Sequence, residues 1–119
     1  MRIILCGDLL FSSQNLLNRL DRRIVDLLTG ADAVFANAEF STPLPSTPPG
    51  LCMYLTSVPQ NRLDELTELN IRLVSFANNH TTDYGWQGAL ETMEAAEARG
   101  LIPCGVGRNL EQARKARFL

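Results

Sequence analysis

Short apolar runs alternate with stretches of helical periodicity along the whole chain, and this alternation constrains the fold more than any other feature. The β-rich runs are 3–6, 33–40, 71–77 and 101–107. Stretches in which apolar residues recur every three or four positions follow them, at 13–29, 59–69, 86–99 and 109–116. The resulting order, strand then helix four times over, predicts an α/β fold with a layered, mostly parallel sheet flanked by helices.

Glycine and proline set the expected boundaries. Gly7-Asp8 is expected to close the first strand, which we predict to be buried, in a turn, and Gly30 to end the first helix. Pro59 is placed to open the second helix, with Leu63, Leu66 and Leu69 on one face.

Two loops carry glycine or proline in distinctive patterns. Four prolines in "STPLPSTPPG", residues 41–50, exclude a helix or central strand and predict a surface loop that shapes one wall of a cleft. "GVG" at 105–107 lacks the further glycine of a dinucleotide fingerprint and the lysine of a P-loop. We therefore interpret it as a tight turn between strand and helix.

Composition narrows the class of protein. The 119 residues, 45% hydrophobic and 20% charged, suit one soluble globular domain. The net charge of −2 and the scattered Lys and Arg residues argue against nucleic-acid binding. Cys6, Cys52 and Cys104 form an odd set without CxxC spacing, which favours a reducing compartment. The opening run "MRIILCGDLLF" is too short to span a membrane and has no signal-type cleavage site, so we expect a cytoplasmic location.

Polar residues follow three of the predicted strands. They are Asp8 after the first strand, Asn37 and Glu39 at the second, and the Asn78-Asn79-His80 run after the third. Right-handed crossovers bring the carboxyl ends of parallel strands to one edge, where ligands bind. Carboxylate, amide and imidazole groups are suitable ligands for Mn²⁺, Mg²⁺, Fe²⁺ or Zn²⁺, so the pattern predicts a divalent-cation site.

Each of these residues also has a purely structural interpretation. Gly-Asp is a common turn, Glu39 could be a solvated acid, and the two asparagines could turn the chain. A single histidine such as His80 is often a hydrogen-bonded structural residue. Asp83 is placed to cap the helix that follows. The functional interpretation rests on the coincidence of these residues at successive strand ends.

Three segments carry a family resemblance. "GDLLF", "DAVFANAEF" and "SFANNHTTDYGWQGALETMEAAEARGLIPCGVGRNLEQA" resemble the bacterial capsule synthesis proteins of the CapA, or poly-γ-glutamate synthesis (PGA_cap), family, which have a calcineurin-like metallophosphoesterase fold. The resemblance runs from the first strand to about Ala113. It implies that Asp8, Glu39 and Asn79 are metal ligands.

The same resemblance implies roles for the neighbouring residues. His80 would lie beside the metals as a proton donor or phosphate contact. Asn37, Asn78 and Asp83 would support the ligands or contact the substrate. The complete protein would hold two divalent metal ions, and Mn, Fe, Zn and Mg remain open.

The chain also departs from the family pattern. Phe11, Ser12 and Ser13 stand where many relatives carry an Arg or His that would contact an anionic substrate. Relatives are longer, this chain has no histidine after His80, and "RKARFL" is typical of the start of another strand. We therefore expect residues 1–119 to be the amino-terminal part of the domain, truncated at its C-terminus, with uncovered surfaces that favour a homo-oligomer. Such a fragment should bind metal weakly and hydrolyse little.

The leading hypothesis is a metal-dependent phosphoesterase-like hydrolase of capsule or poly-γ-glutamate biosynthesis, acting on an anionic polymer or phosphorylated substrate. The alternative is a non-catalytic subunit that binds an anionic polymer or an assembly partner. A third interpretation is a flavodoxin-like or nucleotide-binding module, which the visible absorbance of a bound flavin would reveal. Relatives can be envelope-associated, although no membrane segment is expected in this chain.

Overall fold

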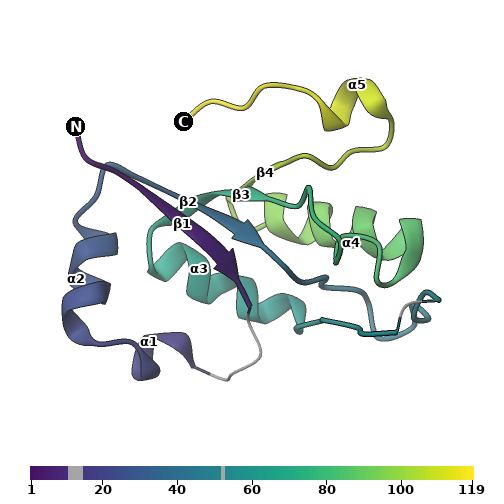
Figure 1. Ribbon diagram of the computed structural model, residues 1–119, viewed down its shortest axis with the longest axis horizontal. Helices are drawn as coiled ribbons and strands as arrows, with labels where there is room; N and C mark the ends of the chain where they lie inside the picture. The colour runs from purple at the N-terminus through teal and green to yellow at the C-terminus, as the bar shows by residue number, and fades with distance from the viewer. Residues whose placement is uncertain (11–14, 52) are drawn as a thin grey trace.

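A parallel four-stranded sheet organises the molecule (Figure 1). The computed structural model describes residues 1–10, 15–51 and 53–119. The strands are β1 (Ile3–Leu9), β2 (Ala33–Ala38), β3 (Ile71–Ser75) and β4 (Ile102–Cys104), in the spatial order β1-β2-β3-β4. The helices are α1 (Leu16–Arg19), α2 (Arg22–Thr29), the 3-10 helix η1 (Gln60–Leu63), α3 (Asp64–Glu68), α4 (Gly85–Glu97) and α5 (Leu110–Ala113). The α/β prediction is confirmed.

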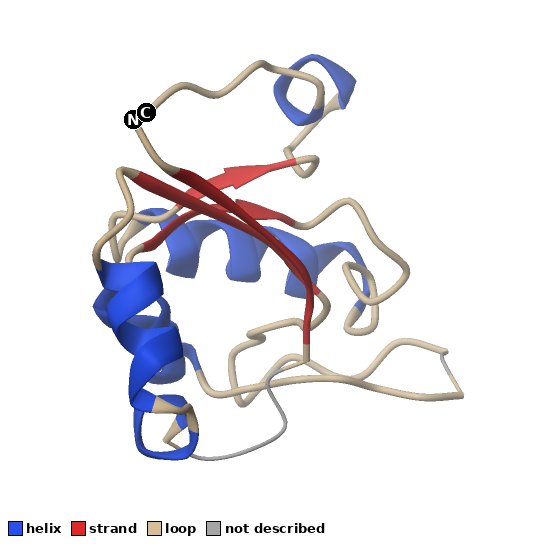
Figure 2. Ribbon diagram, turned by 60° about the vertical axis from the view of Figure 1, so that its left-hand side comes forward, coloured by secondary structure: helices blue, strands red, loops and turns tan. Residues whose placement is uncertain are grey.

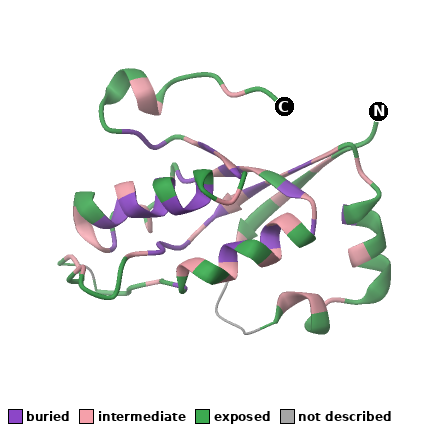
Figure 3. Ribbon diagram, turned by 180° about the vertical axis from the view of Figure 1, so that it is seen from behind, coloured by how far each residue is buried: buried purple, intermediate pink, exposed green. Residues whose placement is uncertain are grey.

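The two faces of the sheet differ in how they are covered. Helices α2, α3 and α4 lie on one side, and the C-terminal segment with α5 lies on the other (Figure 2). Val34, Ala36 and Val74 point to the helical side and are fully buried. On the other side, Leu5 of β1 leaves 76% of its surface exposed. Buried residues gather along α3, α4 and the central strands, and much of α2 and the C-terminal segment is exposed (Figure 3).

The first strand is longer and more exposed than the sequence indicated. Gly7 and Asp8 lie inside β1, because Asp8 pairs with Asn37 of β2 after an irregularity in the register that follows Leu5. The expected turn at Gly7-Asp8 is therefore wrong. The expected burial is also wrong, since β1 is an edge strand with solvent on its open face. The homo-oligomer that uncovered surfaces would favour stays a prediction.

The helix expected over 13–29 is two helices. The chain is extended at Leu20, and Asp21 then caps α2 by accepting a hydrogen bond from the Arg23 amide at 2.8 Å. This capping aspartate begins a new helix and explains why the leucine periodicity does not give one continuous element. The expected start at Ser13 lies outside the described residues.

The second helical stretch follows the sequence closely. Pro59 precedes η1, which continues into α3, and Leu63, Leu66 and Leu69 are at most 1% exposed. At the C-terminal end, α5 is a single turn, and the described residues 115–119 are irregular, so the strand expected to begin at "RKARFL" is wrong for these residues.

The two predicted loops have the expected form with one difference. At Gly105 the backbone has φ +78°, and a Cβ there would lie 2.5 Å from the Cβ of Ala77, so this strand-to-helix turn requires glycine. The proline-rich loop 41–50 is irregular except for a bridge between Ser41 and Ser57. Ser41 and Thr42 are fully buried, so the loop enters the core before it reaches the surface.

Within the part of the chain that the structure describes, no helix has the length and apolar character needed to cross a bilayer.

Candidate functional site

Polar side chains from the ends of three neighbouring strands form one hydrogen-bonded chain. The Asn37 Nδ2 group donates to Asp8 Oδ1 at 2.8 Å and to Glu39 Oε1 at 3.1 Å. Asn78 Nδ2 donates to Asn37 Oδ1 at 3.1 Å. Parallel pairing of β1, β2 and β3 brings these side chains to one edge, as the topology predicts. Their functional roles stay predictions.

Asn78 links the sheet edge to the loop that follows β3. Its Nδ2 group also donates to the Ala38 carbonyl at 2.8 Å, and its Oδ1 atom accepts the His80 amide at 3.0 Å. The asparagine therefore fixes the turn in which His80 lies. The structural interpretation of this residue is confirmed, and its functional role stays a prediction.

His80 is paired with a buried carboxylate. Its Nδ1 atom lies 2.9 Å from Asp83 Oδ2, and Asp83 is 1% exposed. The Thr56 amide donates to the same Oδ2 atom at 2.7 Å, and the Ser41 hydroxyl donates to the His80 carbonyl at 2.8 Å. The predicted capping role of Asp83 is wrong: Tyr84 occupies the capping position of α4, and the Asp83 carboxylate turns toward His80 instead.

Asn79 lies on the outer side of this pair. It lines an open hollow of about 430 Å³ with Met53, Tyr54, His80 and Asp83. Asp8 lines a different, mostly apolar cavity of about 210 Å³ between β1 and the helices α1 and α2. Asp8 and Asn79 thus line different cavities, and Asn37 holds Glu39 beside Asp8.

The carboxylate oxygens of Asp8 and Glu39 could supply some, but not all, of the ligands of a divalent cation. Both carboxylates lie within hydrogen-bonding distance of one nitrogen, Asn37 Nδ2, so they are close neighbours of like charge. Paired carboxylates beside amide oxygens are typical ligands of hard divalent cations. Among the described residues, however, no three His, Cys, Asp or Glu side chains are grouped closely enough to hold a metal ion. The region thus offers the beginning of a ligand set.

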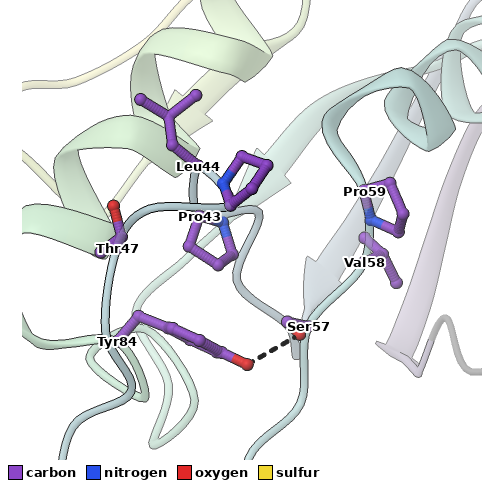
Figure 4. A pocket seen from close by; sticks show the side chains of 8 residues that line it. Pro43, Leu44, Thr47, Ser57, Val58, Pro59 and Tyr84 are labelled. Atoms are coloured by element: carbon purple, nitrogen blue, oxygen red, sulfur yellow. Dashed lines mark hydrogen bonds between the residues drawn. The ribbon is translucent and has the colours of Figure 1, made fainter.

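The proline-rich loop forms one wall of a groove beside the site. The groove has a volume of about 310 Å³, and its lining residues are Pro43, Leu44, Pro45, Thr47, Ser57, Val58, Pro59 and Tyr84. Figure 4 shows the Tyr84 hydroxyl directed at Ser57, 3.0 Å from its Oγ atom. Tyr84, which lines this groove, directly follows Asp83, which lines the hollow with His80.

A buried glutamate fastens this wall to α4. Glu91 is 7% exposed, and it accepts hydrogen bonds from the Leu44 amide at 2.8 Å and from Gln87 Nε2 at 2.9 Å. The Thr47 hydroxyl donates to it as well, at 2.7 Å. Burial alone would raise the pKa of Glu91, but these donors together hold that pKa below its usual value. The loop is therefore positioned by an ionised side chain.

Sequence reasoning missed several residues around the hollow and the groove. Met53, Tyr54, Thr56 and Ser57 reach the site from a segment with no polar cluster at a strand end, and Tyr84 comes from the segment after β3. The one available signal was the position of Tyr84 directly after Asp83.

The two cysteines that the structure describes, Cys6 and Cys104, show no sign of a reactive thiolate. Burial raises the pKa of Cys6 and of Cys104, which keeps both thiols protonated at neutral pH. Cys52 lies outside the described residues, as do Phe11, Ser12 and Ser13, where the family pattern predicted a missing substrate contact.

Comparison with known proteins gives matches over most of the chain. The model of the family described as "Bacterial capsule synthesis protein PGA_cap" matches residues 2–119. Two curated proteins of Sinorhizobium fredii (strain NBRC 101917 / NGR234), the uncharacterized proteins y4sH and y4uA, are each 34% identical to the chain over 102 residues. Each match covers 81% of this chain and 22% of the relative, so the chain spans about a fifth of these relatives' length.

Proposed function

The chain belongs to the PGA_cap family of bacterial capsule synthesis proteins, and from this premise we propose that it carries part of the site of a metal-dependent phosphoesterase-like hydrolase. Membership of the family associates the chain with capsule synthesis. The observation that carries the hydrolase proposal is the hydrogen-bonded chain from Asp8 through Asn37 and Asn78 to His80, at the carboxyl ends of three adjacent strands.

The proposed ligands of a divalent cation are Asp8, Glu39 and Asn79, with two cations in the complete protein. A bound cation of this kind would polarise a phosphoryl oxygen and lower the pKa of a water molecule. Asn37 supports this arrangement, because one amide group holds both carboxylates side by side. The proposed substrate is an anionic polymer, such as poly-γ-glutamate, or a phosphorylated intermediate of its synthesis.

His80 is proposed to donate a proton to the leaving oxygen. General acid catalysis of this type contributes roughly 10²- to 10⁴-fold to a rate. Asn78 orients the backbone of His80, and Asp83 holds its ring. The described residues provide only part of a ligand set, and for this reason we expect the 119-residue chain by itself to bind metal weakly and to turn over slowly.

The proposal is tested with the complete protein and bis(p-nitrophenyl) phosphate in the presence of Mn²⁺. Replacing His80→Asn should lower the rate about 10²- to 10⁴-fold, and Asp8→Asn should lower it through loss of metal. Glu97→Gln, an exposed change at the last residue of α4, is the control and should leave the rate unchanged. Full activity in the His80 and Asp8 variants would refute the hydrolase, and brisk turnover by the isolated chain would refute the partial site.

A non-catalytic role in binding an anionic polymer or an assembly partner is the second candidate. The groove of Pro43, Ser57 and Tyr84 supports the assembly partner rather than the anionic polymer, because its lining is mostly apolar and, among the described residues, includes no basic side chain. The two functions separate in cells that depend on the complete protein. A binding subunit should sustain capsule formation with His80→Asn in place, whereas a hydrolase should not.

A further inference from the structure

Two hydrogen-bond donors converge on a single oxygen of Asp83. The Thr56 amide nitrogen lies 2.7 Å from Asp83 Oδ2, and His80 Nδ1 lies 2.9 Å from the same atom. A backbone N–H can only donate, and an ionised carboxylate can only accept. With Asp83 ionised, this oxygen accepts from Thr56 and from His80 alike, which places the hydrogen of the contact with His80 on Nδ1.

Both partners of this contact are held in place by further bonds. The Gly50 amide donates to the Asp83 carbonyl at 2.7 Å, and the Ser41 amide donates to the Thr56 carbonyl at 2.9 Å. The His80 carbonyl accepts the Ser41 hydroxyl, as described above. Asp83 is almost fully buried, and the His80 side chain is 16% exposed. The pair thus has little freedom to exchange one hydrogen-bonding arrangement for another.

We propose that Asp83 is a positioning residue that fixes His80 as the Nδ1–H tautomer and leaves Nε2 as the nitrogen available to the hollow lined by Met53, Tyr54 and Asn79. A carboxylate that holds the opposite nitrogen of a working histidine sets its tautomer and its ring orientation. The tautomer follows from the two contacts of an ionised Asp83 oxygen, and only its use in catalysis rests on the proposed function.

In catalysis, His80 would lose and regain its Nε2 proton without a change in the orientation of the ring. A water oxygen forms the new bond to phosphorus and releases a proton to solvent, and the imidazolium transfers its Nε2 proton to the leaving oxygen as the bond between phosphorus and that oxygen breaks. The electron pair of the broken bond stays on the oxygen, which takes the proton. His80 is left as the neutral Nδ1–H tautomer, which Asp83 and Thr56 already favour, and Nε2 regains a proton from water.

His80 is the single histidine of the chain, so its tautomer can be read directly. The 119-residue chain is labelled with ¹⁵N-histidine, kept metal-free with EDTA, and recorded by long-range ¹H–¹⁵N correlation at a pH where the ring is neutral. The expected result is one tautomer with the hydrogen on Nδ1. A spectrum of the Nε2–H tautomer, or of both tautomers in comparable amounts, would overturn the inference without any variant.

Two substitutions then separate positioning from a general structural role. In Asp83→Asn the amide oxygen can still accept from both donors, so Nδ1–H should persist. In Asp83→Ala this acceptor is gone, and both tautomers should be populated; an unchanged spectrum would contradict the role of Asp83. Asp64→Ala, an exposed aspartate at the start of α3, is the control. If Asp83→Ala does not fold, the wild-type and Asp83→Asn spectra still decide the assignment.

Activity of the complete protein gives the last readout. Loss of positioning should lower kcat of Asp83→Ala about 10-fold or more at nearly constant KM, with substantial recovery in Asp83→Asn. Equal losses in both variants would contradict positioning through the oxygen. Full activity in His80→Asn would refute the proposed function while the Nδ1–H spectrum left the assigned tautomer standing, so the two failures are distinguishable.

Discussion

The two ends of the hydrogen-bonded chain at the sheet edge differ in how far the protein itself satisfies them. At one end, the Asp83 carboxylate is buried and binds the Thr56 amide and the His80 ring. At the other end, Asp8 is exposed on the edge strand and shares the Asn37 amide with Glu39. At the first end, two hydrogen-bond donors from the protein stabilise one carboxylate. At the second end, two carboxylates share one donor and repel each other, and a bound cation would offset this repulsion.

The largest expected effect is the loss of stability on removing the buried carboxylate. Asp83→Ala leaves the Thr56 amide and the His80 ring without their acceptor, which should lower the free energy of unfolding by about 2–4 kcal/mol. Asp8→Ala, at the exposed end, should change it by no more than about 0.5 kcal/mol. Urea denaturation of both variants measures the difference, and equal losses would remove the contrast between the two ends.

A second buried carboxylate shows whether ionisation itself stabilises the walls of the site. Glu91→Gln weakens the hydrogen bonds from Leu44 and Thr47 and should lower the free energy of unfolding by about 1–2 kcal/mol at neutral pH. The pKa of Glu91 is lowered in the folded state from 4.5, so its contribution is present above pH 4.5 and is lost as the pH falls through the lower, folded-state pKa.

The pH dependence of unfolding therefore provides the check on Glu91. Wild type should lose stability below pH 4.5 more steeply than Glu91→Gln, which has no such carboxyl group to protonate. Glu97→Gln, an exposed glutamate on the same helix, should behave as wild type. Parallel pH profiles for wild type and Glu91→Gln would contradict the stabilising role of the ionised group.

The connection between the two ends depends on Asn37, and a smaller effect is expected there. Asn37→Ala removes the hydrogen bonds of this residue with Asp8, Glu39 and Asn78. The free energy of unfolding should fall by about 0.5–1.5 kcal/mol. A double-mutant cycle with Asp8→Ala measures the interaction between Asn37 and Asp8. The coupling energy should approach the contribution of one hydrogen bond to the free energy of unfolding. Strict additivity would mean that Asp8 and Asn37 act independently.

The smallest effect should be at the carboxylate pair itself. In metal-free solution, Asp8→Asn and Glu39→Gln should each alter the free energy of unfolding by about 0.5 kcal/mol or less, since each loses a charge but also relieves repulsion. Chemical denaturation with EDTA present measures this. A loss above about 2 kcal/mol for either variant would show that the acids are structural rather than reserved for a ligand.

Much of this arrangement could be predicted from local patterns. Leucine spacing gave the helix of Leu63 and Leu66, and the parallel topology placed Asp8 and Asn37 at one edge. The break at Asp21 was missed, although aspartate is a favoured N-cap residue, because the leucine periodicity continues through it.

The remaining differences depend on residues distant in the sequence. Gly7 and Asp8 continue β1 because β2 offers a parallel partner, which overrides the turn preference of Gly-Asp. The role of Asp83 was misjudged because Thr56, which lies 27 positions earlier, supplies one of the two donors to its carboxylate. A pattern confined to neighbouring positions contains no information about such a contact.

Paramagnetic broadening decides the proposal that Asp8 and Glu39 bind a divalent cation at the sheet edge. Small additions of Mn²⁺ to the ¹⁵N-labelled chain should broaden the Asn37 side-chain amide signals before others, because that amide lies between the two carboxylates. The double variant Asp8→Asn and Glu39→Gln should lose this selectivity, and Glu97→Gln should keep it. Broadening that begins at unrelated surface acids, or that persists unchanged at Asn37 in the double variant, would contradict the account.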